Sequence, residues 1–128
     1  MTMTMQNTEL WTGDDIIIPS VILDEAGRPR DLTGATFTYS VRDEPHGTLL
    51  FPAKTLTLPV VGGPGVVVDD ATAGTLHLVI VSADTIGAVI QGESRDYIHE
   101  LEGVWTGRHD TLWTGRFRLW QSVSGAGA

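Results

Sequence analysis

Two stretches near the C-terminus decide the fold: YIHELEGVW at residues 97–105 and WTGRFRLWQ at residues 113–121. Both alternate apolar with polar side chains, which is typical of a β-strand that buries one face and exposes the other. Polar residues 107–110 separate the two stretches and can form a turn. We therefore expect an antiparallel β-hairpin at this end of the chain.

The apolar faces of the two strands constrain their register, because a slip of one residue moves every side chain to the opposite face. A three-residue loop at 108–110 keeps both apolar faces on one side. It places Trp105 opposite Trp113 and Gly103 opposite Gly115. We expect the two tryptophans to form a structural aromatic pair that closes one end of the core over the glycines.

The same register makes a prediction about the outward residues, which were not used to choose it. Glu100 lies opposite Arg118, and Glu102 lies opposite Arg116. Opposite charges facing each other across strands stabilise a sheet by about 0.2–1 kcal/mol per pair. These two pairs support the predicted register.

The outward face of the hairpin also carries the best candidate contact surface. Large apolar side chains beside ion pairs on an exposed face are typical of protein interfaces, where tryptophan and arginine are enriched. We expect the contact residues to be Trp120, Ile98, Arg116, Arg118 and Trp11.

The remainder of the chain consists of short apolar or alternating runs separated by turn signals, as in a β-sandwich or barrel. Pro19 favours an edge or bulged position for its strand. Ser82 is predicted to be the N-cap of one short helical turn. Pro52 and Pro59 interrupt residues 49–61, so the strands between residues 44 and 68 are not assigned. The other predicted strands are 16–23, 35–42, 66–69 and 75–81.

Composition limits the class of protein. A length of 128 residues favours one domain, and abundant threonine, valine and isoleucine favour an all-β fold. A formal net charge of −8 disfavours nucleic acid as a partner. The chain has no cysteine, no apolar run long enough to span a bilayer and no signal-peptide pattern. We therefore expect a protein made in the cytoplasm that neither enters a membrane nor depends on disulfides.

Short motifs occur between Gly13 and Leu101, among them Gly13-Asp14, residues 31–35 and residues 73–76. Together they resemble motifs of the immunoglobulin-like domains of tailed-phage baseplate and tail structural proteins, such as the N-terminal domains of baseplate upper proteins. The most specific is Leu32-Thr33-Gly34-Ala35 after a Gly-x-Pro turn. The chain departs from the family at His99, where an apolar or aromatic residue is usual, and in its longer, more apolar segment at residues 49–65. The motifs are Gly13-Asp14, Asp24, Gly27, Pro29, residues 31–35, residues 73–76, Leu78, Ser82, Thr85, Tyr97 and Glu100-Leu101.

The resemblance implies an immunoglobulin-like β-sandwich at residues 13–122 that acts as a structural part of a virion. Residues 1–12 would then be a flexible segment or an edge strand, and residues 123–128 a flexible tail. The family supplies no catalytic residue. Expected partners are other virion or tail proteins or further copies of the chain.

No residue pattern predicts a catalytic, cofactor or metal site. The histidines lack metal-ligand spacing, and we expect His99 to be a buried histidine that hydrogen bonds a neighbour. The acidic pairs at 14–15, 24–25 and 69–70 lack the spacing of a calcium loop and suit turns. We therefore expect a non-enzymatic structural or adaptor module. The alternative is a carbohydrate-binding module for host-surface recognition, with Trp11, Trp105 or Trp113 stacking on sugars.

Overall fold

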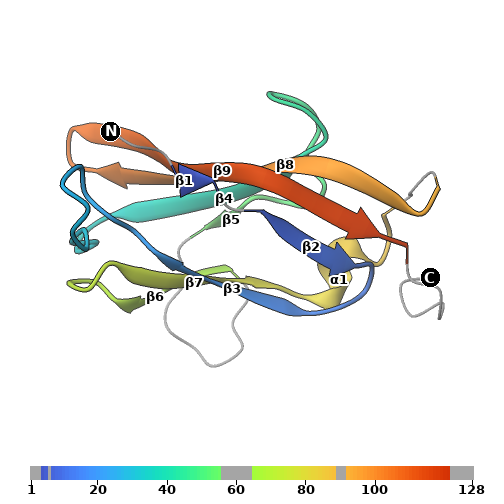
Figure 1. The fold of residues 1–128 in the computed structure, drawn as a ribbon, viewed down its shortest axis with the longest axis horizontal. Coiled ribbons are helices and arrows are strands. Elements are labelled where there is room, and N and C mark those ends of the chain that lie inside the picture. The colour runs from blue at the N-terminus through green and yellow to red at the C-terminus, as the bar shows by residue number, and fades with distance from the viewer. Residues whose placement is uncertain (1–3, 6, 56–64, 89–91, 122–128) are drawn as a thin grey trace.

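The computed structural model describes residues 4–5, 7–55, 65–88 and 92–121, which form a sandwich of two β-sheets (Figure 1). None of the helices in these ranges is long and apolar enough to cross a membrane. The elements are β1 (Thr4–Met5), β2 (Thr8–Trp11), β3 (Ile16–Val21), β4 (Thr36–Arg42), β5 (Lys54–Thr55), β6 (Gly65–Asp70), β7 (Thr75–Ile80), α1 (Ser82–Thr85), β8 (Ser94–Trp105) and β9 (Arg108–Trp120).

The strand order is that of an immunoglobulin-like sandwich, as predicted. One sheet runs β1-β9-β8-β4-β5, with β2 also pairing with β9, and the other runs β3-β7-β6. In immunoglobulin terms, β3, β7 and β6 occupy the B, E and D positions, and β9, β8 and β4 occupy G, F and C. We call these the GFC sheet and the BED sheet.

The core lies between the two sheets. Strand β4 turns Phe37, Tyr39 and Val41 inward, each at most 2% exposed, and β7 contributes its own alternating apolar side chains. β-Branched and aromatic residues at every second position favour this arrangement because they pack well on a pleated surface. The alternation that predicted these strands therefore also identified their buried faces.

The C-terminal hairpin is present, but its predicted register is wrong. Gly103 lies opposite Asp110, not Gly115, and Leu101 lies opposite Trp113. The turn falls at Thr106 and Gly107, where Gly107 has a φ of 74° that suits glycine. Residues 108–110, the predicted loop, belong to β9.

A β-bulge at Leu112 explains why the residues predicted to be buried are buried although the turn lies at a different position. Leu101 pairs with Trp113 and Glu102 pairs with Thr111, so Leu112 has no partner on β8. The extra residue shifts the ladder and turns both Leu112 and Trp113 toward the core, where they are 7% and 2% exposed. The alternation predicted which residues are buried but could not reveal this insertion.

Other predicted elements agree with the structure within a few residues. The four predicted strands correspond to β3, β4, β6 and β7, and β3 is an edge strand, as Pro19 indicated. The helical turn is confirmed, but its N-cap is Val81, not Ser82; the Asp84 side chain accepts the Val81 N–H at 2.8 Å. Between residues 44 and 68 the structure adds β5, while residues 56–64 lie outside the described part of the chain.

The N-terminal segment contributes strands β1 and β2, which pair in parallel with β9. Asn7 lies between these two strands. Its side-chain Oδ1 accepts the Arg116 N–H at 2.9 Å, in place of a main-chain carbonyl. Thus β2 is an edge strand of the GFC sheet. The predicted tail at residues 123–128 lies outside the described residues.

Candidate functional site

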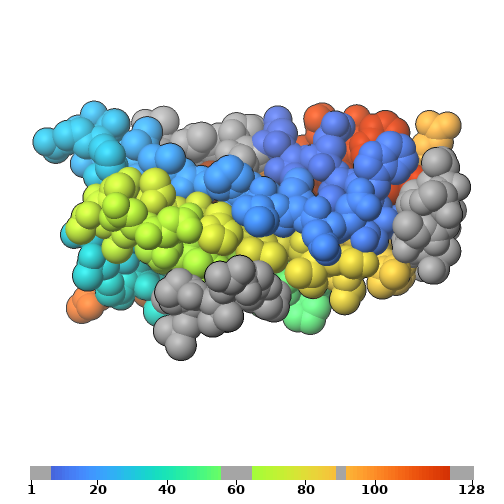
Figure 2. Space-filling view, turned by 90° about the horizontal axis from the view of Figure 1, so that it is seen from below, coloured from blue at the N-terminus to red at the C-terminus, as the bar shows by residue number. Residues whose placement is uncertain are grey.

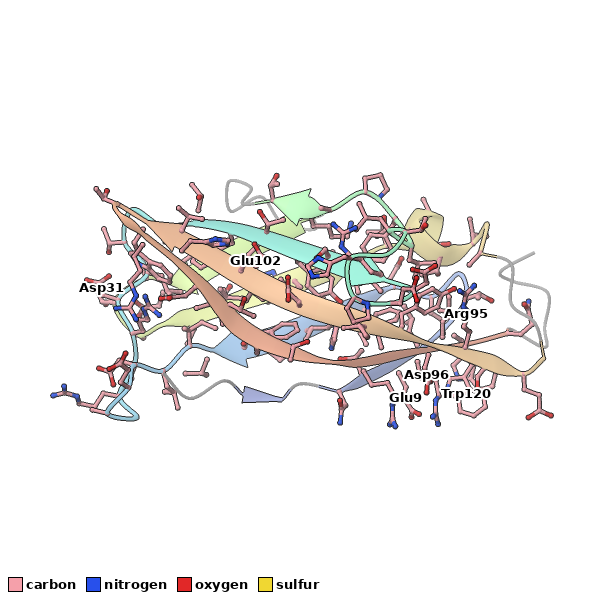
Figure 3. The ribbon with its side chains drawn as sticks, turned by 90° about the horizontal axis from the view of Figure 1, so that it is seen from above. Glu9, Asp31, Arg95, Asp96, Glu102 and Trp120 are labelled. Carbon is pink, nitrogen blue, oxygen red and sulfur yellow. The ribbon has the colours of Figure 1, made fainter. Side chains whose placement is uncertain are left out.

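The predicted contact residues share the outer face of the GFC sheet, over β2, β9 and β8. The side chains of Glu9, Asp96 and Trp120 gather at the end of the sheet far from Asp31 (Figure 3). We call the surface formed by Trp11, Ile98, Arg116, Arg118 and Trp120 the outer patch. Its members come from strands that are distant in sequence, so strand pairing assembles it.

Arg118 is held in place by carboxylates on both neighbouring strands. In the ladders, Asp96 of β8 and Glu9 of β2 both lie opposite Arg118. The Arg118 Nε donates to Asp96 Oδ1 at 2.6 Å, and Arg118 Nη1 lies 3.8 Å from Glu9 Oε1. The hydrogen bond from Arg118 lowers the pKa of Asp96 below its usual value. It also raises the pKa of Arg118, so this ion pair is charged at neutral pH.

Trp11 and Trp120 form an aromatic pair next to Arg118. They face each other across β2 and β9, with ring centroids 5.8 Å apart and planes inclined by 36°. The Arg118 guanidinium lies 5.7 Å from the Trp120 ring. Trp11 is 46% exposed, whereas Trp120 is half-buried. A large apolar surface therefore remains open to solvent beside a fixed charge.

Ile98 and Arg116 extend the outer patch along the hairpin. They lie opposite each other, and Ile98 is 37% exposed. A shallow, mostly apolar groove of about 350 Å³ runs between them and Asn7. Arg116 is exposed and forms no salt bridge with the other described residues.

A second hollow of about 230 Å³ adjoins the outer patch and shares Ile98 with the groove. Glu100 lines it, together with Arg42 and His46. The hydrogen bond that Glu100 shares with Glu102 raises the pKa of Glu100 to about 7, and partial burial and the nearby negative charge act in the same direction. A carboxyl group with a raised pKa thus lies beside the outer patch.

The predicted Trp105–Trp113 pair is wrong, because the observed register places Trp105 opposite Arg108 and Trp113 opposite Leu101. Trp113 is buried, and its Nε1 donates to Ser20 Oγ in the opposite sheet at 3.1 Å. The prediction assumed a loop at 108–110, whereas the tight turn at Gly107 moves β9 along β8.

Trp105 instead lies near the turn end of the sandwich. The Arg30 guanidinium is centred 3.8 Å from its ring, and Phe37 meets it edge-on at 6.0 Å. Its Nε1 donates to the Asp31 carbonyl at 3.3 Å. A Cβ on Gly103 would come within 2.7 Å of the Trp105 ring, so Gly103 makes room for this side chain.

The predicted ion pairs of Glu100 with Arg118 and of Glu102 with Arg116 are also wrong. Arg118 pairs with Asp96, and Glu102 accepts a hydrogen bond from His109 Nε2 at 2.8 Å when that nitrogen is protonated. Glu9 and Asp96 were not among the predicted contact residues. Opposite charge alone could not reveal them, because their position depends on the actual register and on the parallel pairing of β2.

His99 is a buried histidine with a hydrogen-bond partner, as predicted. It is fully buried, and its Nδ1 lies 2.8 Å from the Tyr39 hydroxyl. Burial raises the pKa of Tyr39 well above its usual value. His99 follows Tyr97 by two residues on the strand in the F position, where antibody domains carry the second cysteine of the inter-sheet disulfide. Ring packing with Trp113, at 4.9 Å between centroids, occupies that part of the core here.

Within the described ranges, no group of three or more histidine, cysteine or acidic side chains is arranged to hold a metal ion. No protein-family model matches the chain, and no curated protein matches it. Among solved structures, the chain is similar to the "N-terminal domain of phage TP901-1 ORF48", with 14% identity and a TM-score of 0.46 over 91% of this chain and 85% of that one. At this level of similarity the match assigns neither an activity nor a partner to the chain.

Proposed function

We propose that the chain is a non-enzymatic structural or adaptor module of a phage or prophage tail or baseplate, and that it binds neighbouring virion proteins through the outer patch. The observation that carries this proposal is the exposed Trp11–Trp120 pair beside a doubly paired Arg118. The localisation would be the virion, after synthesis in the host cytoplasm. The phage context rests on the sequence resemblance centred on residues 31–35.

The outer patch has the chemistry of a protein contact. Tryptophan and arginine dominate the binding energy of interfaces because they bury large surfaces at little cost in conformational freedom. The Asp96 and Glu9 carboxylates already orient Arg118, so binding need not order that side chain again. Exposed Ile98 and the charge of Arg116 add an apolar anchor and an attraction for acidic partners.

Incorporation into particles tests the proposal. Tail particles purified from cells that carry the gene should contain the chain by mass spectrometry, and absence from particles would contradict the phage assignment. Trp120→Ala combined with Ile98→Asp should reduce incorporation at least tenfold without changing the thermal midpoint by more than a few degrees. Val104→Ala is the matched control, because Val104 is 45% exposed on the same sheet face at its far end. Normal incorporation of the double variant would exclude the outer patch as the contact.

The structure gives the carbohydrate alternative less support than the sequence did. Trp113 is buried, and Arg30 already occupies a face of Trp105, so Trp11 is the open platform among the three candidates. A glycan array separates the two functions. Sugar binding that Trp11→Ala abolishes, by a chain that is absent from particles, would favour the carbohydrate-binding module.

A further inference from the structure

Among the described residues, β3 ends the BED sheet and leaves one main-chain edge without a neighbouring strand. Ile22 N–H donates to the Gly74 carbonyl at 2.8 Å, and the ladder pairs β3 with β7 in regular antiparallel register. Backbone groups alternate sides along a strand, so Ile18 and Ser20 face β7 while Ile17, Pro19 and Val21 face away from it. This alternation explains why Pro19 is tolerated, because its missing N–H falls on the free side.

The free side of β3 is the position of strand A in an immunoglobulin-like sandwich. Constant-type domains order this sheet A-B-E-D, with strand A next to strand B. Here the strand that precedes β3 is β2, which pairs with β9 in the other sheet. Within the described residues, no strand therefore occupies the A position, and β3 ends the sheet.

The outward side chains of β3, continued by Leu23 just beyond its end, form an apolar row one strand wide. Ile17, Val21 and Leu23 are 63%, 58% and 47% exposed. On the same face, Val67 of β6 and Val79 of β7 are buried at 5% and 7% exposure. The space-filling view of this face shows β3, in blue, running alongside the yellow-green atoms of β6 and β7 (Figure 2). Among the described residues of this sheet face, the exposed large apolar side chains therefore lie along β3. A narrow apolar row of this kind suits the binding of one added strand better than contact with a flat surface.

We propose that the free edge of β3 binds an extended segment of a different protein, which adds to the BED sheet as an antiparallel strand in the A position. Ile17 and Val21 would each exchange main-chain hydrogen bonds with it, and the segment's alternate apolar side chains would cover the apolar row. This contact lies on the sheet opposite the outer patch, so it is independent of the proposed function.

Charge and Pro19 favour a foreign segment over a second copy of β3. An antiparallel pair of copies centred on Pro19 would place two prolines opposite each other and bring Asp14 of one copy opposite Asp24 of the other. Missing donors and facing like charges both destabilise such a pair. A foreign segment would end beside exposed Asp14 and Asp15, so lysine or arginine at its C-terminal end would be favoured.

Amide hydrogen exchange of the isolated full chain, read by NMR, tests whether the edge is open. The Ile17 and Val21 amides should exchange at least tenfold faster than those of Ile18 and Ser20, which face β7. Equal protection of all four amides would show that the edge is already covered and would overturn the proposal.

Selection from a displayed library of random twelve-residue peptides tests the partner chemistry. The expected binders have alternating apolar residues with lysine or arginine toward the C-terminal end, and a synthesised binder should slow exchange of the Ile17 and Val21 amides at least tenfold in the wild-type chain. This protection remains decisive if the proline variants below do not fold. Enrichment of no peptide, or binders that leave these amides unprotected, would contradict strand addition.

Paired substitutions separate main-chain from side-chain recognition. Ile17→Pro with Val21→Pro removes both free-edge donors and should reduce peptide affinity at least tenfold in protein that retains its circular dichroism spectrum. The matched control, Ile17→Thr with Val21→Thr, keeps the N–H groups and should bind with a smaller loss. The opposite ranking would indicate docking on the sheet face, and concentration-dependent dimers lost in the proline variant would indicate a second copy; either result overturns the proposal.

Discussion

Trp113 and Trp120 lie seven residues apart on β9, yet they belong to different environments. Trp113 is 2% exposed, packs on Tyr39 and His99, and donates to Ser20 across the sandwich. Trp120 is half-buried on the outer face beside Trp11 and Arg118. The same residue type thus serves the core on one face of the strand and a candidate contact surface on the other.

The difference shows that the inner and outer faces of the hairpin have different roles. Its inner face gains stability from burial, which is worth several kcal/mol for a large aromatic side chain. Its outer face carries ion pairs that contribute little to stability because solvent screens them. Substitutions on the inner face should therefore change folding, and substitutions on the outer face should change binding.

The largest effect should come from Trp113→Ala. It would leave a cavity beside His99 and remove the hydrogen bond to Ser20, lowering the free energy of unfolding by about 3–5 kcal/mol. Urea denaturation followed by circular dichroism measures the loss. Trp120→Ala is the matched control and should cost less than about 1 kcal/mol; equal losses would remove the distinction between the two faces.

The next effect concerns the buried pair of Tyr39 and His99. His99→Leu leaves the Tyr39 hydroxyl without this partner and should cost about 1–3 kcal/mol, the penalty for an unsatisfied buried polar group. Tyr39→Phe should be destabilising as well. The double variant should lose less than the sum of the two, and strict additivity in this cycle would argue against a stabilising contact.

A smaller, pH-dependent effect is expected on the outer face at Glu100. Its pKa is raised to about 7 from the usual 4.5, so its contribution to stability is complete below pH 4.5 and is lost as pH rises through about 7. Wild type should therefore lose up to about 1 kcal/mol between pH 5 and 8 relative to Glu100→Gln, since much of the group is solvent-screened. Glu102→Gln should remove the same step. An identical pH profile for wild type and both variants would contradict the raised pKa of Glu100.

The smallest effect should follow Asp96→Asn, which weakens the exposed pair with Arg118. The urea midpoint should fall only slightly at low salt, and the difference should vanish near 1 M salt, where the Debye length is about 3 Å. A loss as large as that of Trp113→Ala would show that the outer face also stabilises the fold. Arg118 would lose a carboxylate that orients it. We therefore expect Asp96→Asn to reduce incorporation into particles clearly, although it changes the free energy of unfolding little.

The hairpin illustrates what could be predicted from the sequence. Strict alternation identified both strands and their buried faces, because side chains of a strand point to alternate sides. The register was not predictable by the same means, since shifting one strand by four residues leaves the alternation intact. The turn at Gly107 and the bulge at Leu112 decided it, and Gly107 was the local signal for the turn.

The candidate site, too, could be predicted only in part from the sequence. The sequence singled out Trp11, Ile98, Arg116, Arg118 and Trp120, and strand pairing places them on one sheet face. It did not identify Glu9 or Asp96, because a parallel pairing between the two ends of the chain leaves no local pattern. Nor could it show that β3 ends its sheet among the described residues, since this follows from the pairing of β2 with β9 in the opposite sheet.

By itself, the sequence determined an all-β sandwich, the buried faces of its main strands and the side chains available for contact, because local alternation and residue type carry that information. Only the tertiary structure decided the hairpin register, the partners of Arg118, the separate environments of Trp105 and Trp113 and, among the described residues, the position of β3 at the end of its sheet. Those features depend on which strands lie side by side, and non-local pairing is set by the packing of the whole chain.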